Sequence, residues 1–324
     1  MTAFTMAKAL NAGLRRSLEA DPKVLLAGED IGRLGGVFRI TEGLQEEFGT
    51  DRVVDSPLAE SGIVGTAIGL ALRGYRPVVE IQFEGFVFPA FDQIVSQLSR
   101  MFFRSHGRLP MPVVVRMPAG GGVGAIEHHS ESPEAYFAHT PGLKVVTPSN
   151  PLDAYWMIQQ SIASDDPVIF FEPKRRYHEK GEVDLVAPPL PLHRARVVKP
   201  GRDATLLTYG GQVRTCLEAA VAAAEEGKDL EVVDLRSLSP LDDATVLESV
   251  ARTGRAVVVH EASRNAGLGA EIAARVQEGC FFSLHAPVLR VTGYDFPYPP
   301  SKLESEFLPD LDRILDAVDR TLAY

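Results

Sequence analysis

Short apolar runs alternate with longer amphipathic segments along the first 180 residues. The runs are rich in β-branched residues, which is typical of buried strands, and they are Val24–Ala27, Val53–Asp55, Pro77–Phe83, Pro112–Arg116, Lys144–Thr147 and Val168–Glu172. Apolar positions recur at helical spacing between them, in Thr41–Phe48, Gly62–Arg73, Ala90–Arg104, Glu134–Phe137 and Leu152–Ser164. Strands that alternate with helices form parallel sheets covered on both faces, so the pattern predicts an open α/β domain.

The pattern changes near Gly181, where residues 181–203 are rich in proline and lack periodicity. We interpret this segment as an ordered linker. The alternation then resumes, with predicted strands at Ala204–Tyr209, Leu230–Leu235, Ala256–His260 and Pro287–Val291 and helices at Gly211–Glu226, Ala244–Arg252, Gly267–Glu278 and Leu311–Leu322. Because 324 residues exceed the usual size of one core, the sequence predicts two α/β domains, 1–180 and 204–324, on either side of the linker 181–203.

Composition narrows the functional classes. The formal net charge of −10 argues against broad binding to nucleic acids or anionic membranes. Cys216 and Cys280 are the two cysteines, far apart in the chain, so a secreted disulfide framework is not expected and a cytoplasmic location is. No apolar run reaches the roughly 18 residues that span a bilayer. The first 22 residues carry three basic side chains, as a targeting peptide would, but acidic residues follow, which favours a structural helix.

The segment DSPLAESGIVGTAIGLALRGYRP combines a strand end, a proline and a helix start. Glu60 lies where this helix begins, and a carboxylate there could simply stabilise the helix N-terminus. Three glycines, Gly62, Gly65 and Gly69, fall at helical spacing on one face. Each costs about 1 kcal/mol relative to alanine inside a helix, so the stripe predicts close packing against another backbone, across a subunit contact.

Three long stretches carry a resemblance that covers essentially the whole chain. DSPLAESGIVGTAIGLALRGYRPVVEIQFEGFVFPAFDQIVSQ, RMPAGGGVGAIEHHSESPEAYFAHTPGLKVVTPSNPLDA and PVIFFEPKRRY resemble the beta subunit of the decarboxylating component of 2-oxo acid dehydrogenase complexes. The resemblance implies a transketolase-like pyrimidine-binding domain followed by a transketolase C-terminal-type domain, and thiamine diphosphate as the cofactor.

In that family, the glutamate that matches Glu60 hydrogen-bonds ring nitrogen N1′ of the cofactor's aminopyrimidine and is catalytic. Its chemistry needs a carboxyl group with a raised pKa, and the apolar neighbours Leu58, Ala59 and Ile63 would provide such a setting. Leu58 and Ala59 are expected to touch the cofactor. Glu29 follows a predicted strand, at the edge where open parallel sheets place ligands, and is expected to bind the same ring.

Residues 82–86 follow another predicted strand and belong to the same expected site. The resemblance makes Gln82 and Phe86 cofactor contacts, and Phe83, Glu84, Gly85 and Phe86 substrate contacts. Some family members specific for branched substrates have tyrosine at position 86. The histidine that matches His129 is the second catalytic residue, which exchanges a proton with the acyl group or the lipoyl group, as an imidazole suits.

A metal site is the alternative use of this region. His128, His129, Glu131, Glu134 and His139 form a cluster in the sequence that a zinc hydrolase could use, but HExxH and paired CxxC spacings are absent, and no metal site is predicted in this chain. By resemblance, backbone carbonyls near Val113 and Ser161 could hold a monovalent cation such as K⁺.

Thiamine-diphosphate enzymes hold Mg²⁺ and the diphosphate through a GDG segment, and this sequence contains no GDG. A chain with the activating carboxylate but without that segment has half of an active site. We therefore expect an alpha subunit that supplies Mg²⁺, in an α₂β₂ heterotetramer, and a lipoyl-bearing acyltransferase as a further partner. The second domain would serve dimerisation and docking. Its Glu261, His260 and Arg264 could be surface polar groups, and its acidic residues Glu304, Glu306, Asp310 and Asp312 could meet a basic docking domain or form a solvated face.

The activity expected from these observations is oxidative decarboxylation of a 2-oxo acid with acyl transfer to lipoyl groups. The stretches HHSESPEAYFAH and FFEPKRRY favour a branched-chain 2-oxo acid over pyruvate. The alternatives are a pyruvate or acetoin dehydrogenase beta subunit, a non-catalytic assembly subunit, and the zinc hydrolase.

Overall fold

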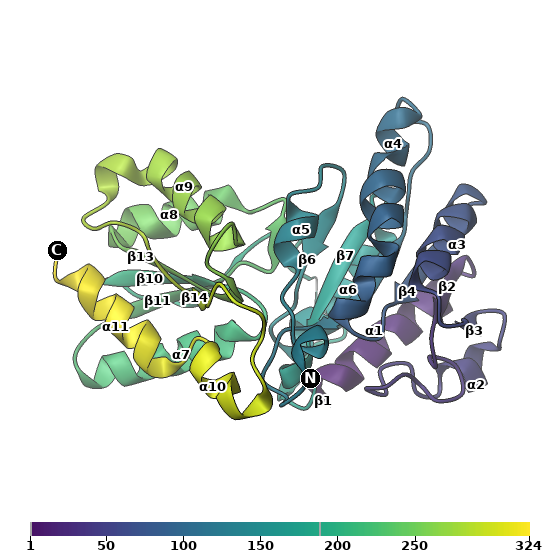
Figure 1. The fold of residues 1–324 in the computed structure, drawn as a ribbon, viewed down its shortest axis with the longest axis horizontal. Helices are drawn as coiled ribbons and strands as arrows, with labels where there is room; N and C mark the ends of the chain where they lie inside the picture. Colours follow the sequence, from purple (N-terminus) through teal and green to yellow (C-terminus); the bar gives the residue numbers. More distant parts are fainter. Residues whose placement is uncertain (1, 188) are drawn as a thin grey trace.

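The computed structural model describes residues 2–187 and 189–324, which form two α/β lobes side by side (Figure 1). The first lobe is built on a seven-stranded sheet of order β12-β6-β7-β5-β4-β2-β3. Its strands are β2 (Val24–Gly28), β3 (Val53–Asp55), β4 (Arg76–Glu80), β5 (Val114–Ala119), β6 (Lys144–Val146), β7 (Val168–Pro173) and β12 (Ser237–Ser239). All neighbours are parallel except β12, which is antiparallel to β6 and comes from the second half of the chain.

Helices cover both faces of this sheet. On one face, α1 (Met6–Ala20) packs against α6 (Pro151–Ala163) over residues such as Leu10, Leu14 and Ile158. On the other face lie α3 (Glu60–Leu72), α5 (Glu134–Ala138) and a chain of short helical turns. Those turns are η1 (Glu84–Ala90), η2 (Gln93–Gln97), η3 (Leu98–Arg100) and α4 (Met101–Arg104), followed further along by η4 (Glu127–His129).

The second lobe has a five-stranded sheet of order β14-β13-β10-β11-β9, in which β9 alone is antiparallel. Its strands are β9 (Arg196–Lys199), β10 (Ala204–Thr208), β11 (Leu230–Asp234), β13 (Ala256–Ser263) and β14 (Leu289–Gly293). Figure 1 shows α7 and α11 on one face and α8 and α9 on the other. These helices span Gln212–Glu225 (α7), Asp243–Thr253 (α8), Leu268–Cys280 (α9) and Leu311–Leu322 (α11), with η6 (Phe281–Ser283), η7 (Ser301–Leu303) and α10 (Glu304–Phe307) in the connections.

One apolar core is continuous between the two lobes. It joins Ile63 and Val64 of α3 to Val246 of α8 and Ile272 of α9, through residues that include Leu238 of β12. Each Å² of apolar surface buried in this shared core stabilises the fold by about 25 cal/mol, and this burial holds the lobes together. The predicted two-sheet α/β fold is therefore confirmed, and one strand from the second half of the chain, β12, joins the sheet of the first lobe.

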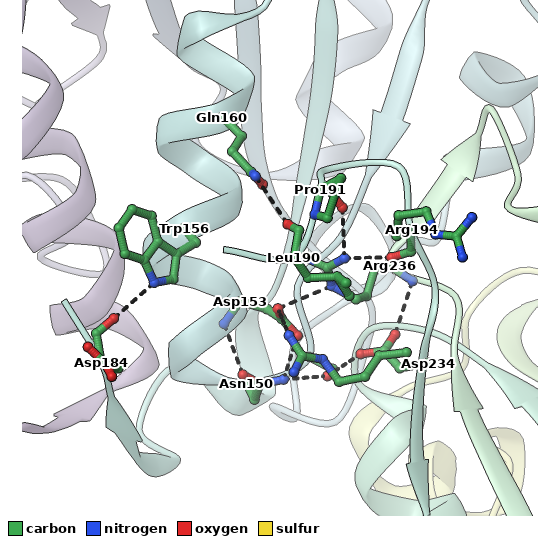
Figure 2. A network of polar contacts seen from close by, with 12 residues as sticks. Asn150, Asp153, Trp156, Gln160, Asp184, Leu190, Pro191, Arg194, Asp234 and Arg236 are labelled. Carbon is green, nitrogen blue, oxygen red and sulfur yellow. Dashed lines mark hydrogen bonds and ion pairs between the residues drawn. The ribbon is translucent and has the colours of Figure 1, made fainter. Parts of the chain in front are cut away.

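Residues 184–195 connect β8 (Lys180–Val183), which pairs with β1 (Thr2–Thr5), to β9. Figure 2 shows how side chains hold the described part of this connection. On α6, Trp156 Nε1 donates to the Asp184 carbonyl at 2.9 Å and Gln160 Nε2 donates to the Leu190 carbonyl at 3.1 Å. The buried Arg236 donates to the Pro191 carbonyl at 3.2 Å and pairs with Asp153. Side-chain donors therefore satisfy the backbone carbonyls of Asp184, Leu190 and Pro191 in this connection.

Two predicted helices differ from the structure. The helix predicted at Thr41–Phe48 is reduced to α2 (Leu44–Phe48), because Gly43 has a φ of +78° and ends the regular path on its N-terminal side. The helix predicted at Ala90–Arg104 is a succession of 3₁₀, π and α turns. Its buried positions, such as Ile94 and Leu98, predict a helical path but do not distinguish these hydrogen-bond types.

Candidate functional site

Two carboxyl groups lie near the carboxyl ends of the neighbouring strands β2 and β3. Glu29 follows β2, and Glu60 is the first residue of α3, the helix after β3. The Glu29 side chain is buried, and its Oε1 atom has no hydrogen-bond partner within the described chain. Burial raises the pKa of Glu29, and the nearby charges of Glu60 and Asp30 raise it further. The fold thus places the two predicted carboxyl groups within electrostatic reach of each other.

The expected apolar enclosure of Glu60 is not formed by this chain. Leu58 is 80% exposed and Ala59 is also exposed, because both lie on the loop after Pro57 rather than in the helix. Only Ile63, one turn into α3, is buried. The surface around Glu60 is therefore open on the side where Leu58 projects.

An aromatic cluster lies beside the carboxyl groups, built from η1 and η4. The His129 ring centroid lies 4.2 Å from that of Phe83 and 5.2 Å from that of Phe86, both edge to face. Gln82 Nε2 donates to Asp30 Oδ2 at 3.3 Å, which ties this segment to the residue after Glu29. Phe38, which the sequence did not single out, packs its ring 5.5 Å from Phe83. The structure thus gathers Gln82, Phe83, Phe86 and His129 at one edge of the sheet.

His129 has a ring nitrogen that the described chain leaves without a partner. This atom, Nδ1, is buried. Burial lowers the pKa of His129, and the charges of His128 and Lys174 lower it further. A neutral imidazole has one nitrogen that accepts and one that donates, which is what a proton exchange requires.

Glu84 and Gly85 support the cluster instead of lining it with side-chain atoms. Glu84 is fully buried and bonds to the buried Lys174 Nζ at 2.5 Å. Burial raises the pKa of Glu84 to about 7, although the charge of Lys174 opposes the shift. A Cβ atom on Gly85 would overlap the His128 carbonyl oxygen, so glycine allows η1 and η4 to touch. No role is predicted for Lys174 from the sequence alone. The pattern that could have indicated one is the basic run Lys174–Arg176, which follows β7.

The glycine-rich loop that leads to His129 contacts the second lobe. Gly121 N donates to Glu261 Oε2 at 3.0 Å, and Gly122 N donates to Glu304 Oε1 at 2.8 Å. Glu261 also pairs with Arg175 at 2.8 Å, and His260 is fully buried and accepts from Gly269 N. The expectation that Glu261 and His260 are surface groups is therefore wrong. On β13, Glu261 points into the junction between the lobes, whereas the neighbouring His260 packs within the second lobe against α9.

Comparison with known proteins identifies the family. The family models for the transketolase pyrimidine-binding domain and the transketolase C-terminal domain match residues 2–180 and 193–314. The pyruvate dehydrogenase E1 component subunit beta of Leifsonia xyli subsp. xyli is 66% identical over 98% of this chain and 95% of its own length. The 3-methyl-2-oxobutanoate dehydrogenase subunit beta of Mycobacterium tuberculosis H37Rv is 54% identical over 98% of this chain and 92% of its own. This chain belongs to the beta subunits of 2-oxo acid dehydrogenases.

The fold of this beta subunit is also that of a split-gene transketolase, solved as an inactive beta4 tetramer. The TM-score is 0.80 at 22% identity, with 99% of this chain and 98% of the other covered, which shows a shared fold. The two domain models and this likeness confirm the transketolase-like architecture.

The beta-subunit family implies thiamine diphosphate, and the residues present fit the pyrimidine half of that cofactor. Glu29 Oε1 is a buried acceptor without a hydrogen-bond partner in the described chain. An amino or imino group of the ring could donate to it. Phe83 and Phe86 offer an apolar surface for a flat ring. The diphosphate half has no such match, because the sequence contains no GDG segment.

The zinc alternative is not supported by the beta subunit's geometry. Among residues 2–187 and 189–324, no group of three or more His, Cys, Asp and Glu side chains is arranged to hold a metal ion. Glu134, which the zinc hypothesis used, instead accepts from the Tyr209 hydroxyl at 2.6 Å. Nor does any helix in the described ranges have the length and apolar content of a membrane span.

Proposed function

We propose that this beta subunit supplies the activating carboxylate and the acyl-handling histidine of a thiamine-diphosphate-dependent 2-oxo acid dehydrogenase. The observation that carries the proposal is the buried, unpartnered Oε1 of Glu29 close to Glu60, beside the Phe83–Phe86–His129 cluster. Carboxyl groups, an aromatic wall and a neutral imidazole are the groups needed to bind a protonatable ring and to move a proton next to it.

When bound, thiamine diphosphate supplies the nucleophilic carbon and accepts the electron pair that decarboxylation releases. Glu60 would hold or release the proton of ring nitrogen N1′, Glu29 and Gln82 would orient the ring, and Phe86 would flank it. Leu58 and Ala59 would contact the cofactor from the loop before α3. Phe83 and the backbone of Glu84 and Gly85 shape the acyl pocket. The imidazole of His129 moves the proton that the acyl group or the lipoyl group requires.

The other half of the site belongs in this proposal to an alpha subunit within an α₂β₂ assembly. That subunit would hold Mg²⁺ and the diphosphate, since diphosphate needs a metal and amide donors that this chain's sequence does not provide. The exposed Leu58 and the open side of Glu60 support a partner surface there. A lipoyl-bearing acyltransferase would then receive the acyl group. A K⁺ ion near the carbonyls of Val113 and Ser161 stays a prediction from the resemblance.

For the substrate we favour a branched-chain 2-oxo acid, in line with the sequence stretches noted above and with the name of the M. tuberculosis relative. Pyruvate is the second candidate, because the 66% identical relative is named as a pyruvate dehydrogenase subunit. The phenyl rings of Phe83 and Phe86 offer an apolar wall to a branched aliphatic chain.

Reconstitution tests the proposal. The chain mixed with its alpha subunit, thiamine diphosphate and Mg²⁺ should decarboxylate 3-methyl-2-oxobutanoate with a kcat/KM roughly ten- to a hundredfold above that for pyruvate, as expected for a pocket fitted to extra methyl groups. The chain alone should neither turn over substrate nor bind the cofactor tightly. Micromolar binding by the isolated chain in calorimetry would refute the split site, and a preference for pyruvate would select the second candidate.

A further inference from the structure

The glycine-rich loop of residues 120–126 is closed at its base but held at its tip by the second lobe. Gly120 N donates to the Glu131 carbonyl at 2.9 Å. This bond joins the start of the loop to the segment that follows His129. Beyond this base, the amides of Gly121, Gly122 and Gly124 donate to Glu261 of β13, to Glu304 of α10 and to the Tyr298 hydroxyl. The position of the tip therefore depends on residues remote in sequence.

Three backbone amides show how the tip is held. Gly121 N donates to Glu261 Oε2 at 3.0 Å, Gly122 N to Glu304 Oε1 at 2.8 Å, and Gly124 N to Glu304 Oε2 at 3.0 Å. Backbone amides that converge on a carboxylate form charge-assisted hydrogen bonds, which are roughly twice as strong as neutral ones. Glu304 thus bonds two loop amides with its two oxygens.

The loop sequence is fitted to these partners. Gly120, Gly122 and Gly124 have φ values of +80°, +88° and +72°, a region that side chains disfavour. A Cβ atom on Gly121 would overlap the Tyr298 hydroxyl, and one on Gly120 would lie 2.7 Å from Glu261 Oε2. The glycines are needed because the second lobe approaches so closely, and no phosphate has to be invoked to explain them.

Both carboxylates are themselves fixed. Glu304 Oε1 accepts from the Tyr298 hydroxyl at 2.7 Å, and Glu261 Oε1 pairs with Arg175 at 2.8 Å. Arg175 follows β7 and is adjacent to Lys174, the partner of Glu84 beneath the aromatic cluster. The loop is therefore clamped between the second lobe and the strand end that supports the candidate site.

The loop continues directly into η4, which carries His129 between Phe83 and Phe86. We propose that Glu304, together with Glu261, is a latch that holds the amides of Gly121, Gly122 and Gly124 and so positions His129 for its proton exchange. Glu304 is a positioning residue in this account, acting through the loop, and the proposal rests on the role of His129 given above. It makes the second lobe part of the catalytic apparatus.

Amide hydrogen exchange tests the latch without any activity. In the full chain, Glu304→Ala should speed exchange of the peptide covering residues 119–130 roughly tenfold or more, because each lost bond to a charged acceptor is worth about one such factor. Glu304→Gln should have a smaller effect, since its amide retains one acceptor for Gly122 N but presents a donor to Gly124 N. Glu306→Ala is the matched control, because Glu306 is an exposed glutamate on the same short helix.

Activity of the complex reconstituted with the alpha subunit gives the second readout, with an artificial electron acceptor in place of the acyltransferase. Glu304→Ala should lower kcat roughly tenfold while KM for the 2-oxo acid changes less than twofold, with partial recovery in Glu304→Gln. Loop exchange in Glu304→Ala within twofold of the unmodified chain would overturn the latch. If exchange rises but the unmodified complex has no decarboxylase activity, the latch stands as a structural contact and the proposed function fails.

Discussion

Glu29 and Glu60 follow adjacent strands, yet they differ in their surroundings. Glu29 is buried with one oxygen unpartnered, whereas Glu60 begins a helix next to an exposed loop. A carboxylate at a helix start gains at most about 1 kcal/mol from the macrodipole, and any acidic side chain obtains that gain. The helix-stabilising role and the cofactor-activating role of Glu60 can therefore be separated by comparing it with another first-turn glutamate.

Glu60→Gln should lower turnover of the reconstituted complex at least a hundredfold while assembly stays intact, because an amide cannot take up and release a proton. Glu46→Gln, at the exposed first turn of α2, is the control and should leave turnover unchanged. Steady-state kinetics together with size-exclusion chromatography measure both quantities. Near-normal decarboxylation by Glu60→Gln would leave only the helix-stabilising role.

At the scale of single elements, α3 is unusual because its glycine stripe does not face this chain's own backbone. A Cβ atom on Gly69 would meet nothing within 4 Å, and one on Gly65 would make only an ordinary contact with Gln93. Helix α3 lies on the outer side of the first lobe (Figure 1). The close packing predicted from the stripe is therefore not made within the described chain and stays a prediction about a subunit contact.

Gly69→Ala separates these two settings. In the isolated chain it should raise the free energy of unfolding by up to about 1 kcal/mol, because alanine favours the helix. In the heterotetramer it should weaken assembly, since the added methyl group would separate two closely packed backbones. Chemical denaturation of the chain and sedimentation of the complex measure the two effects. Unchanged assembly would show that this face contacts no partner backbone.

For the whole molecule, a buried acid links the lobes. Glu134 of α5 bonds to the Tyr209 hydroxyl, which follows β10, and burial raises the pKa of Glu134 to about 7. Between the ordinary pKa of 4.5 and this value, the folded chain holds a proton that the unfolded chain has lost. The free energy of unfolding therefore falls as pH rises through that window, and Asp234, whose pKa burial also raises to about 7, adds to the fall.

Glu134→Gln should remove its share of this pH dependence, at most roughly 3 kcal/mol between pH 4.5 and 7. Glu225→Gln, an exposed position on α7, is the control and should leave the pH dependence unchanged. Urea unfolding of each variant at a series of pH values measures the difference. The same slope in Glu134→Gln and in the unmodified chain would show that Glu134 does not hold the extra proton.

Ten strands and most of the helices could be predicted from the sequence. Strands buried on both faces of a parallel sheet are near-continuous apolar runs, and the helices between them have apolar residues at helical spacing. β12 was not predictable, since the three residues Ser237–Ser239 pair with β6 of the other lobe and have no local pattern of their own. The helical turns at Ala90–Arg104 were predicted as one helix for the related reason that buried spacing does not encode hydrogen-bond type.

The sequence by itself determined which residue types form the candidate site and which predicted strands they follow. The acid–base and packing properties of carboxylates, histidine and aromatic rings belong to the side chains themselves and can be read without a structure. Tertiary structure alone decided which of them face each other: that Glu84 turns inward to Lys174, that Leu58 projects outward, and that Glu261 and Glu304 reach the glycine loop. These contacts join residues far apart in the chain, and they depend on how two sheets pack over a shared core, which no local pattern records.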